Sequence, residues 1–161
     1  MGDAEALRFA DSTFDLVYSW GVIHHSPDTK QAAAEILRVL RPGGQFKVMI
    51  YHKFSFVGYM LWIRYALLKF KPWVSLAEIY SNYLESPGTK AYTMSDAKKL
   101  FDSASHISCR TVLTHGDLLT ADAGQRHRGI MLTMAKLLWP RRLIQMFFPN
   151  HGLFMLIEGE K

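Results

Sequence analysis

The first third of the chain alternates apolar runs with an amphipathic stretch, a pattern that predicts strand, helix and strand. Phe14–Trp20 is mostly apolar with one polar residue near each end, which is typical of a strand buried on both faces. Ser26 or Asp28 can cap the following helix, and Pro42-Gly43-Gly44 would end it. Its apolar face would hold Ala32, Ala33, Ile36, Leu37 and Leu40. With a second strand over residues 46–51, this is a right-handed βαβ unit, half of a doubly wound sheet.

The last third of the chain repeats this alternation. Ser95 precedes apolar residues spaced by three and four positions, so a short capped amphipathic helix is expected; these residues are Ala97, Leu100, Phe101 and Ala104. Residues 107–113, which include Cys109 and the β-branched Thr111 and Val112, predict a strand, and the apolar run 153–158 predicts another.

Two apolar segments lie between these parts. Residues 54–70 are shorter than the roughly 20 residues that a membrane span requires, and Arg64 stands near their middle. Lysines at both ends would also suit a helix lying at a membrane interface. The favoured interpretation is a lid helix packed over the sheet. Residues 130–148 have the same ambiguity and are broken by Pro140.

Composition and charge add little beyond an ordinary globular protein. The 161 residues are 49% hydrophobic and 20% charged, enough for one core and one domain. The formal charge of +5 is spread along the chain in short clusters, so we expect no nucleic-acid partner. Cys109 is the only cysteine, which excludes a disulfide framework and favours the cytoplasm.

Four short motifs occur in order within residues 2–44. They are Gly2-Asp3-Ala4-Glu5, Phe14-Asp15-Leu16-Val17-Tyr18-Ser19-Trp20-Gly21, His24-His25-Ser26-Pro27-Asp28 and Arg38-Val39-Leu40-Arg41-Pro42-Gly43-Gly44. In this order and at this spacing they resemble the middle of a class I S-adenosylmethionine-dependent methyltransferase. A weaker resemblance continues through a Tyr-Thr-x-Ser-Asp helix start to the end of the chain.

The resemblance implies an α/β fold: a partial Rossmann-like sheet with helical lid insertions and a C-terminal antiparallel strand pair. It divides one domain, residues 1–161, into the second half of the core (1–53), a helical lid (54–93) and C-terminal helices and strands (94–161). In the family, a glycine-rich cofactor loop lies upstream of the Gly-Asp-Ala-Glu segment. No G-x-G-x-x-G pattern occurs here, so we interpret the chain as the C-terminal part of a methyltransferase domain.

The resemblance also implies where S-adenosylmethionine, the family's cofactor, would bind. Asp3 would accept a hydrogen bond from the adenine amino group, and the backbone N–H of Ala4 would donate to the ring; an Asp that merely caps a turn is the alternative. Arg8 replaces a proline that is usual in the family. Ser19, Trp20 and Gly21 would lie beside the methionine part of the cofactor, with Gly21 permitting close approach. Trp20 could instead belong to the core.

His24 and His25 are the candidate catalytic residues. A histidine near its ordinary pKa can accept a proton from a substrate hydroxyl, amine or activated carbon. Packing and hydrogen bonding at the helix start are the alternative role for this pair. We expect no metal site, because the seven histidines form no recognisable metal-binding motif.

The resemblance therefore implies methyl transfer to a small, apolar or aromatic molecule, by a chain that is inactive in isolation. The alternative is a non-catalytic half-Rossmann remnant that binds a membrane surface or a partner chain. Peripheral membrane contact would use residues 54–70. Self-association would use strand Phe14–Trp20, which would have a neighbour on one side only and so expose a row of backbone hydrogen-bonding groups.

Overall fold

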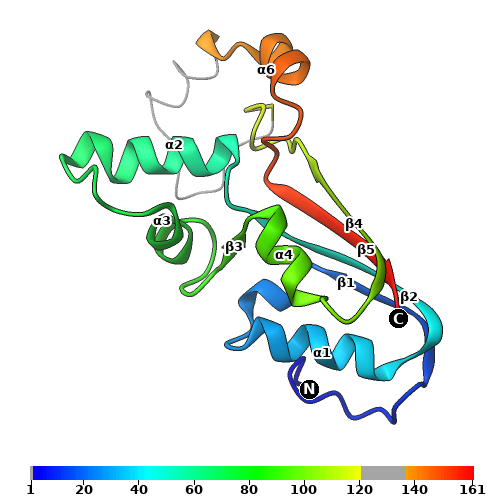
Figure 1. Cartoon of the computed structure of the whole chain (residues 1–161). Helices are drawn as coiled ribbons and strands as arrows, with labels where there is room; N and C mark the ends of the chain where they lie inside the picture. The colour runs from blue at the N-terminus through cyan, green and yellow to red at the C-terminus, as the bar shows by residue number, and fades with distance from the viewer. Residues whose placement is uncertain (1, 121–136) are drawn as a thin grey trace.

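The protein is a mixed α/β structure built around one twisted sheet (Figure 1). The computed structural model describes residues 2–120 and 137–161. The strands lie in the order β1-β2-β5-β4, and the short β3 pairs with β2. Their bounds are β1 Phe14–Trp20, β2 Leu40–His52, β3 Ala91–Tyr92, β4 Ser105–Val112 and β5 Phe154–Glu160. β1 and β3 run parallel to β2, whereas β5 is antiparallel to both β2 and β4. The partial Rossmann-like sheet with a C-terminal antiparallel pair is confirmed.

The βαβ unit is present, but its helix ends earlier than expected. Helix α1, Thr29–Val39, is capped by Asp28, whose side chain accepts from the backbone N–H of Gln31 at 3.0 Å. Leu40 is already extended and begins β2, so the Pro42-Gly43-Gly44 segment lies inside the strand and does not stop the helix. These residues lie where the β1–β2 register shifts, which gives the glycines their role in an irregular strand.

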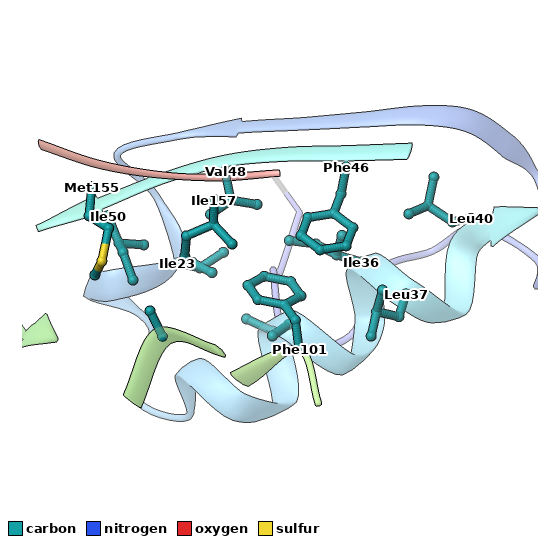
Figure 2. Packing of buried hydrophobic residues seen from close by; sticks show 13 residues of the cluster. Ile23, Ile36, Leu37, Leu40, Phe46, Val48, Ile50, Phe101, Met155 and Ile157 are labelled. Carbon is teal, nitrogen blue, oxygen red and sulfur yellow. The ribbon is translucent and has the colours of Figure 1, made fainter. Parts of the chain in front are cut away.

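One face of the sheet carries the main core. Helix α1 and helix α4, Met94–Leu100, cover this face, and the rings of Phe46 and Phe101 stack with centroids 4.5 Å apart (Figure 2). The cap of α4 is Thr93, which accepts from the backbone N–H of Asp96 at 3.1 Å, rather than the expected Ser95. The sequence periodicity located the helix, and the cap lies two residues earlier.

The opposite face of β1 is open. Leu16, Tyr18 and Trp20 are 53%, 63% and 48% exposed, so the expectation that this strand is buried on both faces is wrong. No helix within the described ranges covers their side chains. A depression of about 200 Å³ lies here, lined in part by Tyr18, Trp20, Lys47, Arg110, Leu156 and Glu158. We call the exposed side chains of Leu16, Tyr18 and Trp20 the open face.

The lid helices pack on each other beyond the carboxyl end of β2 (Figure 1). Helix α2, Phe56–Tyr65, continues through the 3₁₀ turn Leu67–Lys69 and packs on α3, Leu76–Tyr83. Their shared core contains Leu61, Ala66 and Ile79. Each lid helix buries apolar side chains against the other, and Tyr80 of α3 also packs with Met49 and Tyr51 of β2. The lid therefore contacts the sheet at these residues, although Leu16, Tyr18 and Trp20 of β1 stay exposed. Among the described helices, none is long and apolar enough to cross a membrane.

A buried carboxylate joins the C-terminal segments. Asp117 is fully buried and accepts hydrogen bonds from the backbone N–H groups of Val57, Thr114 and Leu153 at 3.2, 2.9 and 2.9 Å. Three donors to one carboxylate compensate its loss of hydration. Pro140 immediately precedes α6, Arg141–Phe147, in line with the expected break. The rest of the expected helical segment, residues 130–136, lies outside the described residues.

Gly58 tests the packing between α2 and α3. A Cβ at Gly58 would fall on the hydroxyl of Tyr80 and lie 2.8 Å from its ring carbon Cζ. Helix propensity alone would make Gly58→Ala stabilising by about 1 kcal/mol. We expect the overpacking penalty to exceed this gain and to lower the free energy of unfolding by about 1–3 kcal/mol, measured by urea denaturation. Asn82→Ala, at an exposed position of α3, is the control and should be neutral or stabilising. Equal behaviour of the two variants would contradict the packing.

Candidate functional site

The Gly2-Asp3-Ala4-Glu5 loop is attached to the start of α1. The Oδ1 atom of Asp3 accepts from the backbone N–H of Glu5 at 2.9 Å. Glu5 in turn accepts from the backbone N–H of Asp28 at 2.8 Å, and its carbonyl accepts from the side chain of Gln31 at 3.3 Å. The acidic loop thus lies beside the N-terminus of the helix that follows the histidine turn.

Arg38 holds the rest of the N-terminal segment. Its guanidinium donates to both carboxylate oxygens of Glu35, to the carbonyls of Leu7 and Phe9, and to Asp11, at 2.6–2.9 Å. The hydrogen bonds from Arg38 hold the pKa of Glu35 below its ordinary value. We call Arg38 and Glu35 the arginine clamp. Arg38 bonds to the backbone carbonyls of Leu7 and Phe9, on both sides of position 8. The N-terminal segment therefore stays attached to α1 although arginine replaces the proline that is usual at position 8.

The carboxyl end of β1 turns sharply at Gly21. Its φ of +70° favours glycine, and its backbone N–H donates to the carbonyl of Met49 at 3.1 Å. Ser19 is half-buried on the strand. Trp20 stacks on Tyr18 and meets Phe154 edge to face, with centroids 6.0 and 5.7 Å apart. The tryptophan therefore belongs to the open face rather than to the core.

The turn after Gly21 places two histidines in contrasting surroundings. His24 and His25 lie in the 3₁₀ turn Ile23–His25. The His24 ring is fully buried against His25 and Tyr51, with centroids 4.2 and 4.3 Å away. Neither of its ring nitrogens has a hydrogen-bond partner within the described residues. Burial, followed by the nearby His25, lowers the pKa of His24 to about 4, so this imidazole is neutral at pH 7.

His25 faces a carboxylate and two hydroxyls. Its Nε2 lies 3.5 Å from Oε2 of Glu85. Its Nδ1 lies 3.3 Å from Oγ of Ser86 and 3.4 Å from Oγ1 of Thr89. The other oxygen of Glu85, Oε1, accepts from the hydroxyl of Tyr51 at 2.6 Å. Burial, and next the hydrogen bond to Glu85, raise the pKa of Tyr51, which keeps this hydroxyl a donor.

The loop that carries Glu85 is tied to the histidine turn. Lys90 donates through Nζ to the carbonyls of Ser26 and Pro27 at 2.9 and 2.6 Å, and its backbone N–H donates to the carbonyl of His24 at 3.2 Å. Glu85 lies about sixty residues from His25 in sequence. Sequence reasoning missed it because no spacing rule links the two; only the Ser-Pro-Gly turn before Thr89 marks a loop at this place.

The structure brings some of the predicted site residues together. His24, His25 and Gly21 share the turn at the carboxyl end of β1, where ligands bind in open α/β sheets. Asp3 and Ala4 make no such contact themselves; their neighbour Glu5 connects the loop to this turn by accepting a hydrogen bond from the backbone N–H of Asp28. The residues that the sequence did not suggest are Tyr51, Glu85, Ser86 and Thr89.

Comparison with known proteins identifies similar chains. Residues 1–48 match a family described as the methyltransferase domain. A phthiotriol/phenolphthiotriol dimycocerosates methyltransferase of Mycobacterium tuberculosis is 49% identical over 45 residues, which are 28% of this chain and 17% of that protein. Phosphoethanolamine N-methyltransferase 2 of Caenorhabditis elegans is 39% identical over 51 residues, which are 32% of this chain and 12% of that protein.

The likeness in fold extends over the whole chain. A crystal structure of a methyltransferase from Thermotoga maritima, described as S-adenosylmethionine-dependent and a possible histamine N-methyltransferase, aligns with a TM-score of 0.61 and 18% identity. The alignment covers 99% of this chain and 62% of that one. The chain spans about a quarter or less of the curated relatives that it matches.

The buried His24 predicts a pH dependence of stability. Its pKa is lower in the folded state than its unfolded value near 6.5, so the unfolded chain binds the proton more tightly. Stability should therefore fall as the pH drops from 6.5 toward 4, by on the order of 2 kcal/mol after allowance for solvent screening. Urea denaturation at several pH values measures this loss.

The matched variants are His24→Phe and His106→Asn. Phenylalanine removes the titrating group, so the slope between pH 6.5 and 4 should decrease; a smaller slope remains, because burial also lowers the pKa of His52. His106 is exposed, and asparagine tolerates its positive φ of 52°. An unchanged slope in His24→Phe would contradict the assignment.

Proposed function

Since the chain carries part of a methyltransferase domain and has the fold of class I S-adenosylmethionine-dependent methyltransferases, we propose that it contributes the acceptor side of a methyl-transfer site. The observation that supports this most directly is the turn at the carboxyl end of β1, where Gly21, the two histidines and the Glu85 loop converge. A ligand at this edge could come close to the backbone of Gly21 and would face the half-exposed imidazole of His25 and the carboxylate of Glu85.

S-adenosylmethionine supplies an activated methyl group on a sulfonium sulfur. The protein then has to align a nucleophile with that methyl carbon and keep water away. We propose that Asp3 and the backbone of Ala4 address the adenine. Asp3 is exposed and uses Oδ1 for Glu5, and a carboxylate offers further acceptor positions. Gly21 and Ser19 would adjoin the methionine part, with Trp20 bounding the pocket on the open face.

We propose that His25, rather than His24, accepts the proton of the methyl acceptor. The side chain of His25 is 32% exposed, whereas His24 is fully buried and resists protonation above about pH 4. Glu85 beside Nε2 would stabilise the imidazolium that forms. His24 would then act by packing and by fixing the position of its neighbour.

We propose a small molecule as the acceptor. The lid segment contributes exposed aromatic side chains, among them Trp73 and Tyr83, which are 76% and 38% exposed. This environment supports an apolar or aromatic compound. The two named relatives are a phosphoethanolamine methyltransferase and a phthiotriol/phenolphthiotriol dimycocerosates methyltransferase, so a compound with a polar head or a lipid character also belongs in a substrate panel.

The 161-residue chain alone should bind S-adenosylmethionine more weakly than micromolar, because Asp3 and Ala4 address only the adenine and no glycine-rich loop is present in the sequence. Titration of a ¹⁵N-labelled sample with millimolar cofactor should shift the amide signals of Asp3, Ala4 and Gly21.

Asp3→Ala should weaken binding by roughly 1.5–3 kcal/mol, about tenfold or more. Asp102→Ala, an exposed aspartate on a different loop, should leave the affinity unchanged. Micromolar binding, or equal affinity in the Asp3 variant, would contradict the assignment.

The open face favours a second property, self-association. Among the described strands β1 pairs only with β2, and the open face exposes three large apolar side chains. Sedimentation velocity at tens of micromolar should show dimers or larger species. Leu16→Lys with Tyr18→Lys should shift the protein toward monomer, whereas Leu68→Lys, at an exposed residue of the lid, should not. A monomeric wild-type chain with a sharp thermal transition would contradict this proposal.

A further inference from the structure

We propose that His24, His25 and Glu85 form a binding site for a zinc ion. One potential ligand atom from each residue lies within 4.8 Å of the other two. In a tetrahedral zinc site the metal–ligand distances are about 2.0–2.2 Å, so ligand atoms lie about 3.4 Å apart. Nε2 of His25 and Oε2 of Glu85 are 3.5 Å apart, so this pair already has the required spacing, and small side-chain rotations would bring in His24.

The state of His24 is the second observation that indicates a ligand. A buried imidazole normally has a hydrogen-bond partner, and an exception calls for an explanation such as a water or an ion. His24 is fully buried, and both of its nitrogens lack a partner within the part of the chain that the structure describes. Its ring lies directly against His25, 4.2 Å between centroids. A neutral imidazole is the form that binds zinc.

The groups around the cluster fit the role of supporting ligands. Metal-binding histidines and carboxylates are usually oriented by hydrogen bonds at their other atoms. With zinc on Nε2, the Nδ1–H of His25 would donate to the hydroxyl of Thr89 or Ser86, which lie at 3.4 and 3.3 Å. Glu85 accepts from Tyr51 at 2.6 Å through Oε1, the oxygen not facing His25. Two of the three proposed ligands, His25 and Glu85, are thus oriented by other side chains without an ion.

The chemical types of the three ligands favour zinc over other ions, and their exposure allows an ion to enter. Two imidazoles and one carboxylate suit zinc, whereas magnesium and calcium prefer oxygen ligands. The side chains of His25 and Glu85 are 32% and 52% exposed, so an ion can enter from solvent. A tetrahedral ion would keep its fourth position for water or another small ligand. This site is inferred from the side-chain geometry and does not depend on methyl transfer, although zinc and the acceptor's proton would compete for His25.

The test is a cobalt titration of the chelator-treated chain, without cofactor, followed by visible absorption and then by displacement with zinc. We expect one cobalt ion per chain with the intense visible band of tetrahedral coordination, and its loss on addition of one equivalent of zinc. His25→Gln and Glu85→Gln should each weaken binding at least tenfold. Both change half-exposed or exposed side chains, so the fold should persist, which circular dichroism verifies.

His106→Asn is the matched control and should leave the affinity unchanged, because its side chain is exposed on β4, outside the cluster. Absence of saturable one-to-one binding would overturn the proposal, as would equal affinity in the wild type, His25→Gln and Glu85→Gln. A cobalt–thiolate charge-transfer band would also overturn it, because it would assign the ion to Cys109. Loss of zinc binding would leave the cofactor titration of Asp3→Ala unaffected, so the two proposals fail separately.

Discussion

The arginine clamp is the interaction on which the N-terminal part of this protein depends. Residues 7–11 have no strand or helix of their own within the described structure, so hydrogen bonds must hold them. Arg38 contributes three of these bonds, to Leu7, Phe9 and Asp11, and two further bonds to Glu35 fix its guanidinium fork. The backbone N–H of Leu7 closes the arrangement by donating to Glu35 at 2.7 Å. One side chain of the Arg38–Gly44 motif therefore holds the segment that links the acidic loop to β1.

Residues of the helix motif therefore have a structural role, because they hold other segments in place. Arg41 likewise pairs with Asp15 at 2.8 Å and joins the end of the helix motif to the start of β1. These contacts hold the acidic loop, β1 and α1 in fixed relative positions. Gly21 and the histidine turn lie at the carboxyl end of β1 in this arrangement. The chemistry proposed for this edge needs these groups in fixed relative positions, and charge-assisted hydrogen bonds supply that rigidity.

The sheet is covered unequally, and this decides how the molecule can interact. α1 and α4 bury one face, while the open face leaves Leu16, Tyr18 and Trp20 in contact with solvent. The lid helices pack on each other and, through Tyr80, on Met49 and Tyr51 of β2, but they leave the open face of β1 uncovered. Apolar side chains in a continuous strand do not reveal whether a covering layer exists, because coverage is supplied by other elements.

The sequence by itself located the elements of the first third and showed a resemblance to class I S-adenosylmethionine-dependent methyltransferases. Local signals suffice there: a period of 3.6 along α1, apolar runs for the strands, and Asp28 as a cap. It also indicated β4 and β5 as an antiparallel pair through the resemblance. Tertiary structure alone decided which face of β1 is open and that Glu85 meets His25. Those outcomes depend on contacts between residues far apart in the chain, for which periodicity and spacing carry no information.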